Sequence, residues 1–346
     1  MCQPADSIGK DGGLVTLEQA AAHQFGIVPN KITAVRRAFK VVSVQGIFAL
    51  KKSRQSKTGI HFIHAAKEHL YEQGMTNIDR YVLTPDKAPY ADVEEHLFVM
   101  SAWVDSREAH YDALSDVIPA ATVLAMLHQS ARGFVPPAAP DRIWWGSWPG
   151  LWHERLETLQ QYKAIAQTQV APSRFDRRFL RYIDRHWEQG REALQILTGS
   201  EYTNVTAQYQ MAGCICHHDY SERNVLFTPT HTVHLVDFDY SICDLPIHDL
   251  VNFLRRVAKF TSYNGDTACR ALAAYLDINP LSKEELQLFI PLWLWPQKFW
   301  EVTYQYYGEK RTRPRGKYSD RLRRRCHTRE KERCLLEHIA RAFQLS

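Results

Sequence analysis

The residues best suited to chemistry lie in one short segment of the second half of the chain. His217, Asp219 and Asn224 form the pattern H-x-D-x-x-x-x-N, and Asp237 follows 18 positions after Asp219, at the end of an apolar run. Carboxylate and amide oxygens are the ligands that Mg²⁺ prefers, and a carboxylate can accept the proton of an attacking hydroxyl group. The segment predicts Asn224 and Asp237 as metal ligands and Asp219 as a catalytic base. His217 is expected to pack against the loop and hydrogen-bond it.

Two further carboxylates follow the strand that ends at Asp237. Asp239 is either a second metal ligand or only a hydrogen-bond acceptor in a turn. Asp249 follows Pro246 at a predicted helix start. A buried carboxylate there could accept backbone N–H groups and hold the catalytic loop, so we expect Asp249 to be structural.

Together these parts match the sequence pattern of kinases, H-R-D-x-x-x-x-N followed by D-F-G. Here they read H-H-D-x-x-x-x-N and D-F-D. Phosphoryl transfer needs metal ions on the phosphates, a nucleophile held in line and stabilisation of charge, with little covalent participation by the protein. A lone H-x-D is weak evidence, but the Asn at this spacing and the strand ending in Asp make the pattern specific. The sequence therefore predicts a kinase-like fold, and the alternative is a polar β-hairpin without a catalytic role.

The composition is that of a folded protein with one large domain or two lobes. The chain has 346 residues, of which 45% are hydrophobic and 23% charged, which supplies a core and excludes a disordered or fibrous protein. Residues 1–13 are polar and lack the apolar segment of a signal peptide. No apolar run is long enough to predict a membrane span. The odd number of cysteines, seven, favours a reducing compartment.

The order of predicted elements divides the chain near residue 105. Strands are expected in the first part, at 32–36, 41–44, 47–51, 80–84 and 97–104, with a helix at 60–73. Helical patterns dominate afterwards, at 120–130, 151–168 and 175–198. We therefore expect an α+β, bilobal protein kinase-like fold. Its small antiparallel-sheet N-lobe would span 1–104, with 1–13 flexible, and its large, mostly helical C-lobe would span 105–346.

On these residues the sequence resembles the aminoglycoside phosphotransferase and choline kinase superfamily, in which H-x-D-x-x-x-x-N is followed at a similar interval by an Asp on an apolar strand. Within that superfamily it is most similar to the CotS-type spore coat proteins of endospore-forming bacteria. Only Asp219, Asn224 and Asp237 are specific for chemistry, and the other matches are packing and turn patterns. The matching segments lie at 39–41, 46–51, 98–104, 124–128, 133–134, 215–224, 235–239, 249–250 and 296–300.

The resemblance assigns a phosphate-binding lysine in the small lobe. Lys51 ends an apolar strand and looks like the lysine that contacts the α- and β-phosphates of the nucleotide. The alternatives are that Lys51 is only an edge lysine, or that the neighbouring Lys52 takes this role. The acidic partner of the lysine would be Glu68, or else Glu72 one turn later on the same helix.

The same resemblance places the hinge at 100–103, where the backbone of Met100 and Ala102 would pair with the adenine edge, and it implies ATP and Mg²⁺ as cofactors. The chain departs from the kinase pattern in one respect. Kinases cover the phosphates with a glycine-rich loop, but the corresponding region, 36–43, contains no glycine. Backbone amides can approach phosphate without glycine, although with less conformational freedom. The departure bears on activity and not on fold.

Two functions follow from the resemblance. The first is an ATP- and Mg²⁺-dependent phosphotransferase that acts on a hydroxyl group of a sugar, a small molecule or a coat component. Its acceptor pocket would lie in the helical lobe, where Trp144, Trp145 and Trp148 either line that pocket or pack a loop. The alternative is a catalytically inactive structural protein of the spore coat that retains the fold. The resemblance implies other coat proteins as partners, synthesis in the mother-cell cytoplasm and assembly onto the forespore surface.

A basic segment spans 310–333, with many Arg and Lys residues and few acids between them. It is either a solvated helix face or a contact surface for an anionic surface, nucleic acid or coat polymer. Nucleic-acid binding is the weaker alternative, because the sequence shows no stacking motif and no recognised nucleic-acid-binding module.

Overall fold

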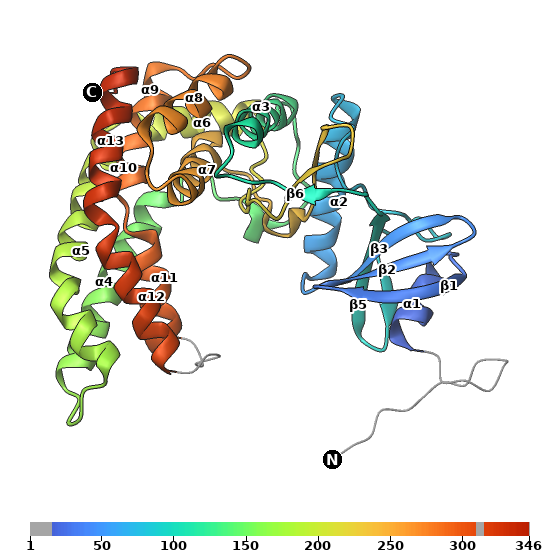
Figure 1. Ribbon diagram of the computed structural model, residues 1–346, viewed down its shortest axis with the longest axis horizontal. Helices are drawn as coiled ribbons and strands as arrows, with labels where there is room; N and C mark the ends of the chain where they lie inside the picture. The colour runs from blue at the N-terminus through green and yellow to red at the C-terminus, as the bar shows by residue number, and fades with distance from the viewer. Residues whose placement is uncertain (1–15, 309–314, 346) are drawn as a thin grey trace. The chain divides into compact units, whose positions relative to one another are not determined.

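The computed structural model describes residues 16–308 and 315–345 (Figure 1). These residues form two compact units. The first comprises 16–109, 130–143 and 217–242, and the second comprises 110–129, 144–216, 243–308 and 315–345. The segment with the chemical motif therefore belongs to the same unit as the N-terminal strands.

A five-stranded antiparallel sheet forms the first part of the first unit, in the strand order β1-β2-β3-β5-β4. The strands are β1 (Pro29–Val35), β2 (Ala38–Ser43), β3 (Gly46–Lys52), β4 (Ala91–Val93) and β5 (His96–Ala102). Its buried side chains, among them Leu50 and Phe98, pack with Ala21 and Ala22 of α1 (Leu17–Gln24). The antiparallel sheet expected of the small lobe is confirmed.

One predicted strand, 80–84, is wrong. Only Tyr81 pairs with a neighbour, in an isolated bridge to Ser101. The chain then turns, because the Thr84 N–H donates to the Ala88 carbonyl and the Lys87 N–H donates back to the Thr84 carbonyl. These turn hydrogen bonds determine the local structure, although the β-branched composition of the segment favours a strand.

Helix α2 (Lys57–Glu72) begins three residues before the helix expected at 60–73. Ser56 explains the earlier start, because its side chain caps the helix by accepting the Gly59 N–H at 3.1 Å. The apolar side chains recur at helical spacing and are buried, as at Ile60, Ile63 and Leu70. Lys67 is buried on the same face, and its partner is described with the site below.

A second, three-stranded sheet completes the first unit, in the order β6-β7-β8. Its strands are β6 (Arg107–Glu108), β7 (Val225–Phe227) and β8 (Val233–Leu235), and both pairings are antiparallel. Leu235 also exchanges backbone hydrogen bonds with the segment after α2, donating to the Asn77 carbonyl and accepting from the Asp79 N–H. Through these bonds the hairpin of β7 and β8 is attached to the chain that follows α2.

The second unit is helical. Its helices are α3 (Leu114–Ser130), α4 (Trp148–Gln167), α5 (Arg174–Thr198), α6 (Tyr202–Ala212), α7 (Pro246–Phe260), α8 (Gly265–Leu276), α9 (Lys283–Gln287), α10 (Phe289–Leu294), α11 (Gln297–Tyr307), α12 (Arg315–His327) and α13 (Arg329–Phe343) (Figure 1). In the part of the chain that the structure describes, no helix combines the length and the apolar composition needed to cross a membrane. The mostly helical remainder expected from the sequence is confirmed.

The core of the second unit forms where α4, α5, α11 and α12 pack together. Helix α5 starts at a capping box made by Ser173 and Asp176, and its buried aromatic rings follow at helical spacing. Phe179 stacks on Phe299 with ring centroids 5.9 Å apart. Gly190 permits the close approach of α4, since a Cβ atom there would lie 2.9 Å from Cδ2 of Leu156.

Candidate active site

The hairpin of β7 and β8 explains the spacing of the chemical motif. Val225 pairs with Leu235 across the hairpin, and the Val236 N–H donates to the Asn224 carbonyl at 3.0 Å. The residue before β7 and the residues after β8 are therefore neighbours. This pairing brings Asn224 beside the chain at Asp237, as expected for two ligands of one metal ion.

Hydrogen bonds within the loop orient Asp219 and Asn224. The Asn224 amide nitrogen donates to the Asp219 carbonyl oxygen at 2.9 Å and to Asp219 Oδ2 at 3.1 Å. Because the NH₂ group is engaged with Asp219, the amide presents its carbonyl oxygen as the atom for a ligand. The arrangement keeps one oxygen ligand and the predicted base side by side.

His217 has a packing position. It is fully buried, its Nε2 lies 3.1 Å from the Val236 carbonyl oxygen, and its ring lies 4.6 Å from that of Phe238. The contact to Val236 joins the two sides of the motif one residue before Asp237. These contacts correspond to the supporting role expected for His217.

Lys51 at the end of β3 forms ion pairs with both aspartates of the D-F-D segment. Its Nζ lies 2.6 Å from Asp237 Oδ1 and 2.8 Å from Asp239 Oδ2. Burial alone would lower the pKa of Lys51, but the carboxylates of Asp239 and Asp237 outweigh this and raise it. Lys51 is therefore charged at neutral pH, and two carboxylates face one ammonium group. The sequence did not anticipate the contact of Lys51 with Asp239.

The backbone of Asp237 is strained and is held by a second carboxylate. Asp237 has φ 66° and ψ 63°, in the left-handed region that non-glycine residues seldom adopt. Its N–H donates to Asp79 Oδ2 at 3.1 Å. Asp79 is in turn paired with Lys67, whose Nζ lies 2.8 Å from Oδ1 and 2.8 Å from the carbonyl oxygen. Lys67 also lies 3.9 Å above the ring of Tyr81.

Sequence reasoning missed both Lys67 and Asp79. One signal was available for the lysine, since Lys67 falls on the apolar face of α2 among Ile60, Ile63 and Leu70, where an unpaired charge is costly. Burial lowers the pKa of Lys67, and the Asp79 carboxylate opposes that shift. Nothing in the local sequence indicated that Asp79 would be the partner.

The structure does not bring Glu68 to Lys51. The Glu68 carboxylate instead pairs with Arg80, which donates from Nε to Oε1 at 3.0 Å and from Nη2 to Oε2. A guanidinium group binds a carboxylate with two parallel hydrogen bonds, and Arg80 also lies 3.7 Å above the Tyr71 ring. Glu72, the other expected partner, is exposed. Asp239 occupies the place beside Lys51 that the sequence analysis gave to a glutamate.

The two predicted hinge residues differ in their access to solvent. Met100 is fully buried, and its carbonyl oxygen accepts the Val82 N–H at 2.7 Å. Ala102 is exposed at the end of β5. An adenine ring could therefore meet the backbone near Ala102, whereas the Met100 carbonyl already has a hydrogen-bond donor.

Two arginines lie at the hairpin turn where kinases have a glycine-rich loop. The β1–β2 hairpin turns at Arg36 and Arg37, and Arg36 has a positive φ of 55°. The guanidinium group of Arg36 forms an ion pair with Glu108 on β6. Glu108 precedes Ala109, whose N–H donates to the carbonyl oxygens of Glu222 and Val225 next to the catalytic loop. The hairpin tip is therefore linked to the segment at Glu222 and Val225 through the ion pair with Glu108.

The donor set fits a magnesium ion bound together with a nucleotide. Asp237 and Asn224, with Asp239, supply the oxygen ligands that Mg²⁺ prefers. The excess of carboxylate over ammonium charge around Lys51 favours a further cation. Side-chain exposures of 25% for Lys51 and 35% for Asp237 leave the site open to a ligand.

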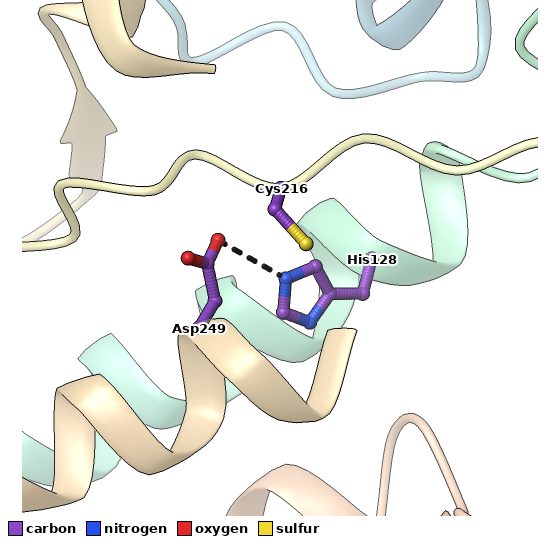
Figure 2. Close-up of side chains that lie close together, drawn as sticks. All are labelled: His128, Cys216 and Asp249. Carbon is purple, nitrogen blue, oxygen red and sulfur yellow. Dashed lines mark hydrogen bonds and ion pairs between the residues drawn. The ribbon is translucent and has the colours of Figure 1, made fainter. Parts of the chain in front are cut away.

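A second cluster of titratable side chains lies in the helical unit and is closed (Figure 2). His128, Cys216 and Asp249 each offer one atom, and these three atoms lie within 4.8 Å of one another. His128 Nε2 is 3.5 Å from Asp249 Oδ2, and Nδ1 is 2.7 Å from the hydroxyl of Tyr275. Burial raises the pKa of the Cys216 thiol, which keeps it protonated and unreactive. The cluster is a packed hydrogen-bonded network, and whether Asp249 holds the catalytic loop stays a prediction.

One of the tryptophans considered for an acceptor pocket is a core residue. Trp148 is 2% exposed, stacks on Tyr202 at 4.9 Å, and donates from Nε1 to Asp244 at 3.0 Å. Burial raises the pKa of Asp244. Of the two interpretations of Trp148, packing is the one that the structure supports.

The fold is that of small-molecule kinases. An aminoglycoside phosphotransferase from Alicyclobacillus acidocaldarius subsp. acidocaldarius DSM 446 superposes with a TM-score of 0.80 at 22% identity, covering 97% of this chain and 99% of that one. Spectinomycin phosphotransferase superposes with a TM-score of 0.60 at 11% identity, covering 89% and 93%. The predicted kinase-like fold is confirmed.

Sequence comparison identifies the family within this fold. The model of the family described as "Spore coat putative kinase YutH" matches residues 18–339, and the chain belongs to that family. Spore coat protein S of Bacillus subtilis (strain 168) is 24% identical over 315 residues, which cover 89% of this chain and 88% of that protein. The resemblance to spore coat proteins is thereby confirmed.

Proposed function

We propose that this protein is an ATP- and Mg²⁺-dependent phosphotransferase that moves the γ-phosphoryl group of ATP to a hydroxyl group. The observation that carries the proposal is the position of Lys51, whose Nζ lies within 2.8 Å of carboxylate oxygens of both Asp237 and Asp239. The hairpin that presents these aspartates also holds Asp219 and Asn224. A lysine, a base and oxygen ligands gathered in this way are the parts that phosphoryl transfer requires.

Each residue has a role that follows from its chemistry. Asp219 accepts the proton of the attacking hydroxyl group, and Lys51 stabilises negative charge on the phosphates. Asn224 and Asp237, with Asp239, hold Mg²⁺, which neutralises phosphate charge when it is bound. The pair of Lys67 and Asp79 acts through Asp237, because Asp79 accepts the backbone N–H that keeps Asp237 in its left-handed conformation.

Complexes of structural relatives support the choice of nucleotide. Spectinomycin phosphotransferase binds ADP together with spectinomycin. Amicoumacin kinase, which superposes with a TM-score of 0.56, binds AMP-PNP and Ca²⁺ together with its acceptor. In this chain the corresponding nucleotide site would use Lys51 for the phosphates and the backbone near Ala102 for adenine.

The acceptor would be a hydroxyl group of a small molecule, a sugar or a component of the spore coat. The family and the relative in B. subtilis support the last of these. Other coat proteins are then the expected partners. We expect the protein to be synthesised in the mother-cell cytoplasm and then assembled onto the forespore surface.

Hydrolysis of ATP in the absence of an acceptor tests the proposal, because water can replace the hydroxyl group. Wild-type protein should release phosphate from ATP only with Mg²⁺ present, and Lys51→Met should abolish the release while leaving the protein folded. If wild-type protein neither hydrolyses nor binds Mg-ATP, the proposal is wrong, and the structural coat protein with a retained fold becomes the better account. The exposed Lys31→Met is the matched control.

A further inference from the structure

Helix α5 carries a row of exposed arginines on one face. Arg174, Arg177, Arg181 and Arg185 are all exposed, at successive spacings of three, four and four residues. Residues at these spacings lie above one another on a helix. With a rise of about 1.5 Å per residue, the row is about 16 Å long. We call these four residues the arginine row.

The charge of the arginine row is only partly compensated within the described residues. Like charges three and four residues apart destabilise a helix, and none of the four arginines forms an ion pair there with a carboxylate. Three of the four acids of the same helix are engaged elsewhere: Asp176 caps the helix start, Asp184 pairs with Lys163, and Glu188 pairs with Arg191. The fourth, Glu192, lies seven residues beyond Arg185, the last arginine of the row. Glu330 of α13 attracts Arg185, so the repulsion that remains is mainly that among Arg174, Arg177 and Arg181.

Two helices that contact α5 carry further arginines. Arg178 fastens α12 to α5 by donating to the carbonyl oxygen of Ser319 at 2.6 Å and to its hydroxyl at 2.7 Å. Helix α12 exposes Arg323 and Arg324. At the start of α13, Arg329 donates to Gln189 of α5 at 2.7 Å. Figure 1 shows α5, α12 and α13 as neighbours in the helical unit.

Positive charges lie close together at the end of the row. Burial lowers the pKa of Arg329 and repulsion from Arg185 lowers it further, while Glu330 and Glu192 oppose this shift. Arg185 and Arg329 likewise add to the effect of burial in lowering the pKa of His186. An anionic partner bound at this face would relieve the repulsion.

We propose that the arginine row is a docking surface for an acidic protein segment rich in Glu or Asp. Guanidinium groups bind carboxylates with paired hydrogen bonds. Exposed arginines near the row already pair with glutamates, as Arg333 does with Glu330 and Arg191 with Glu188. The proposal does not depend on the phosphotransferase activity, because the row is remote in sequence from Lys51 and the catalytic loop and belongs to the other unit.

The aromatic residues of this surface favour an acidic protein segment over a single-stranded nucleic acid. Proteins that bind single strands stack bases on aromatic rings. The aromatic residues of this part of α5, Tyr182 and Trp187, are only partly exposed, and the Trp187 indole donates to the Leu156 carbonyl.

Binding of labelled poly-L-glutamate by the full chain, followed by fluorescence anisotropy, tests the proposal. One variant replaces all four arginines of the row with Gln. The control replaces four exposed cations elsewhere, Lys31, Arg54, Arg270 and Lys283, with Gln and changes the net charge equally. We expect the row variant to bind at least tenfold more weakly than wild type and the control less than twofold more weakly. Because repulsion is removed, the row variant should also unfold at an equal or higher temperature than wild type.

Three results would overturn the proposal. Equal weakening in both variants would show a general effect of net charge. The absence of poly-L-glutamate binding by folded wild-type protein would remove the partner class. The third result is that duplex DNA or polyphosphate binds wild type more tightly than poly-L-glutamate does, at matched charge and salt, and that this binding is lost in the row variant. That result would assign the surface to a phosphate polymer. Failure of Mg-ATP binding alone would leave the proposal intact, so the two functions are tested separately.

Discussion

Two clusters of titratable side chains differ in their access to solvent. In the first unit, Lys51, Asp237 and Asp239 keep 25%, 35% and 15% of their side-chain surfaces exposed. In the helical unit, the side chains of His128 and Asp249 are 0% and 1% exposed. Both clusters combine a carboxylate with a basic nitrogen, so residue type does not distinguish them.

The two clusters also differ in their hydrogen bonds. In the closed cluster His128 contacts Asp249 on one side and Tyr275 on the other, and Asn279 donates to Tyr275 at 2.9 Å. Such a network stabilises the packing of helices. In the open cluster two carboxylates share one ammonium group, and all three groups are partly exposed to solvent. The two clusters therefore differ in how deeply they are buried and in how completely their polar groups are hydrogen-bonded, more than in the types of their residues.

The largest expected effect is on turnover at the open site. Asp219→Asn removes the proton acceptor and should lower the rate of ATP hydrolysis about 10²- to 10⁴-fold. Affinity for Mg-ATP and the unfolding temperature should stay close to wild type, because the amide keeps the shape of the side chain. The exposed Asp86→Asn is the control. Equal rates for Asp219→Asn and wild type would contradict the assignment of the base.

The free energy of unfolding should depend more on the closed cluster than on the open one. Asp249→Ala removes one of the two partners of the buried His128 and opens a cavity, so we expect it to lower the free energy of unfolding by about 3 kcal/mol. Asp239→Asn changes a partly exposed pair and should cost less than about 1 kcal/mol. Urea titration measures both. A larger loss for Asp239→Asn than for Asp249→Ala would reverse the comparison.

Acid should destabilise the helical unit through a buried histidine. Burial lowers the pKa of His186 to about 4, below its ordinary value, so between about pH 6.5 and 4 the unfolded chain binds a proton that the folded chain does not. Stability therefore falls as the pH falls through this window, by about 3 kcal/mol in total. His186→Gln should reduce this pH dependence, and the exposed His153→Gln should not. An unchanged slope for His186→Gln would exclude His186 as the cause.

The smallest effect concerns the hairpin that replaces a glycine-rich loop. If Arg36 leaves Glu108 to contact phosphate, Arg36→Ala should weaken ATP binding about tenfold, which is the order of one charge-assisted contact. The loss should shrink from ATP to ADP to AMP and vanish for adenosine. Calorimetry with the four ligands measures this series. The same loss for adenosine as for ATP would show that the variant damages the fold and not a phosphate contact.

The proximity of Asn224 and Asp237 could be predicted from the sequence because a β-hairpin joins them. The pairing of Val225 with Leu235 brings Asn224 and Asp237 together, and strand patterns can be recognised from local sequence. The partner of Lys51 could not be predicted in this way. Glu68 stands at a suitable position on α2, but Arg80, twelve residues later, binds it, and Asp239 takes the place beside the lysine.

The ion pair between Lys67 and Asp79 could not be predicted from the sequence for a related reason. Lys67 and Asp79 are twelve residues apart, and they meet only because the chain after α2 hydrogen-bonds to Leu235. That contact depends on the tertiary structure and leaves no local pattern. The same is true of Arg142, which donates to the carbonyl oxygens of Asp239 and Ser241 at 2.7 and 3.1 Å.

Calorimetric titration of ATP with Mg²⁺ into the wild-type protein and into Asp237→Ala tests the central claim most directly. We expect micromolar binding by the wild type and the loss of that binding in Asp237→Ala, with both proteins folded by circular dichroism. Binding that survives in Asp237→Ala would contradict the assigned metal site. The absence of binding by folded wild-type protein would contradict the claim that the cluster of Lys51, Asp237 and Asp239 is a nucleotide site.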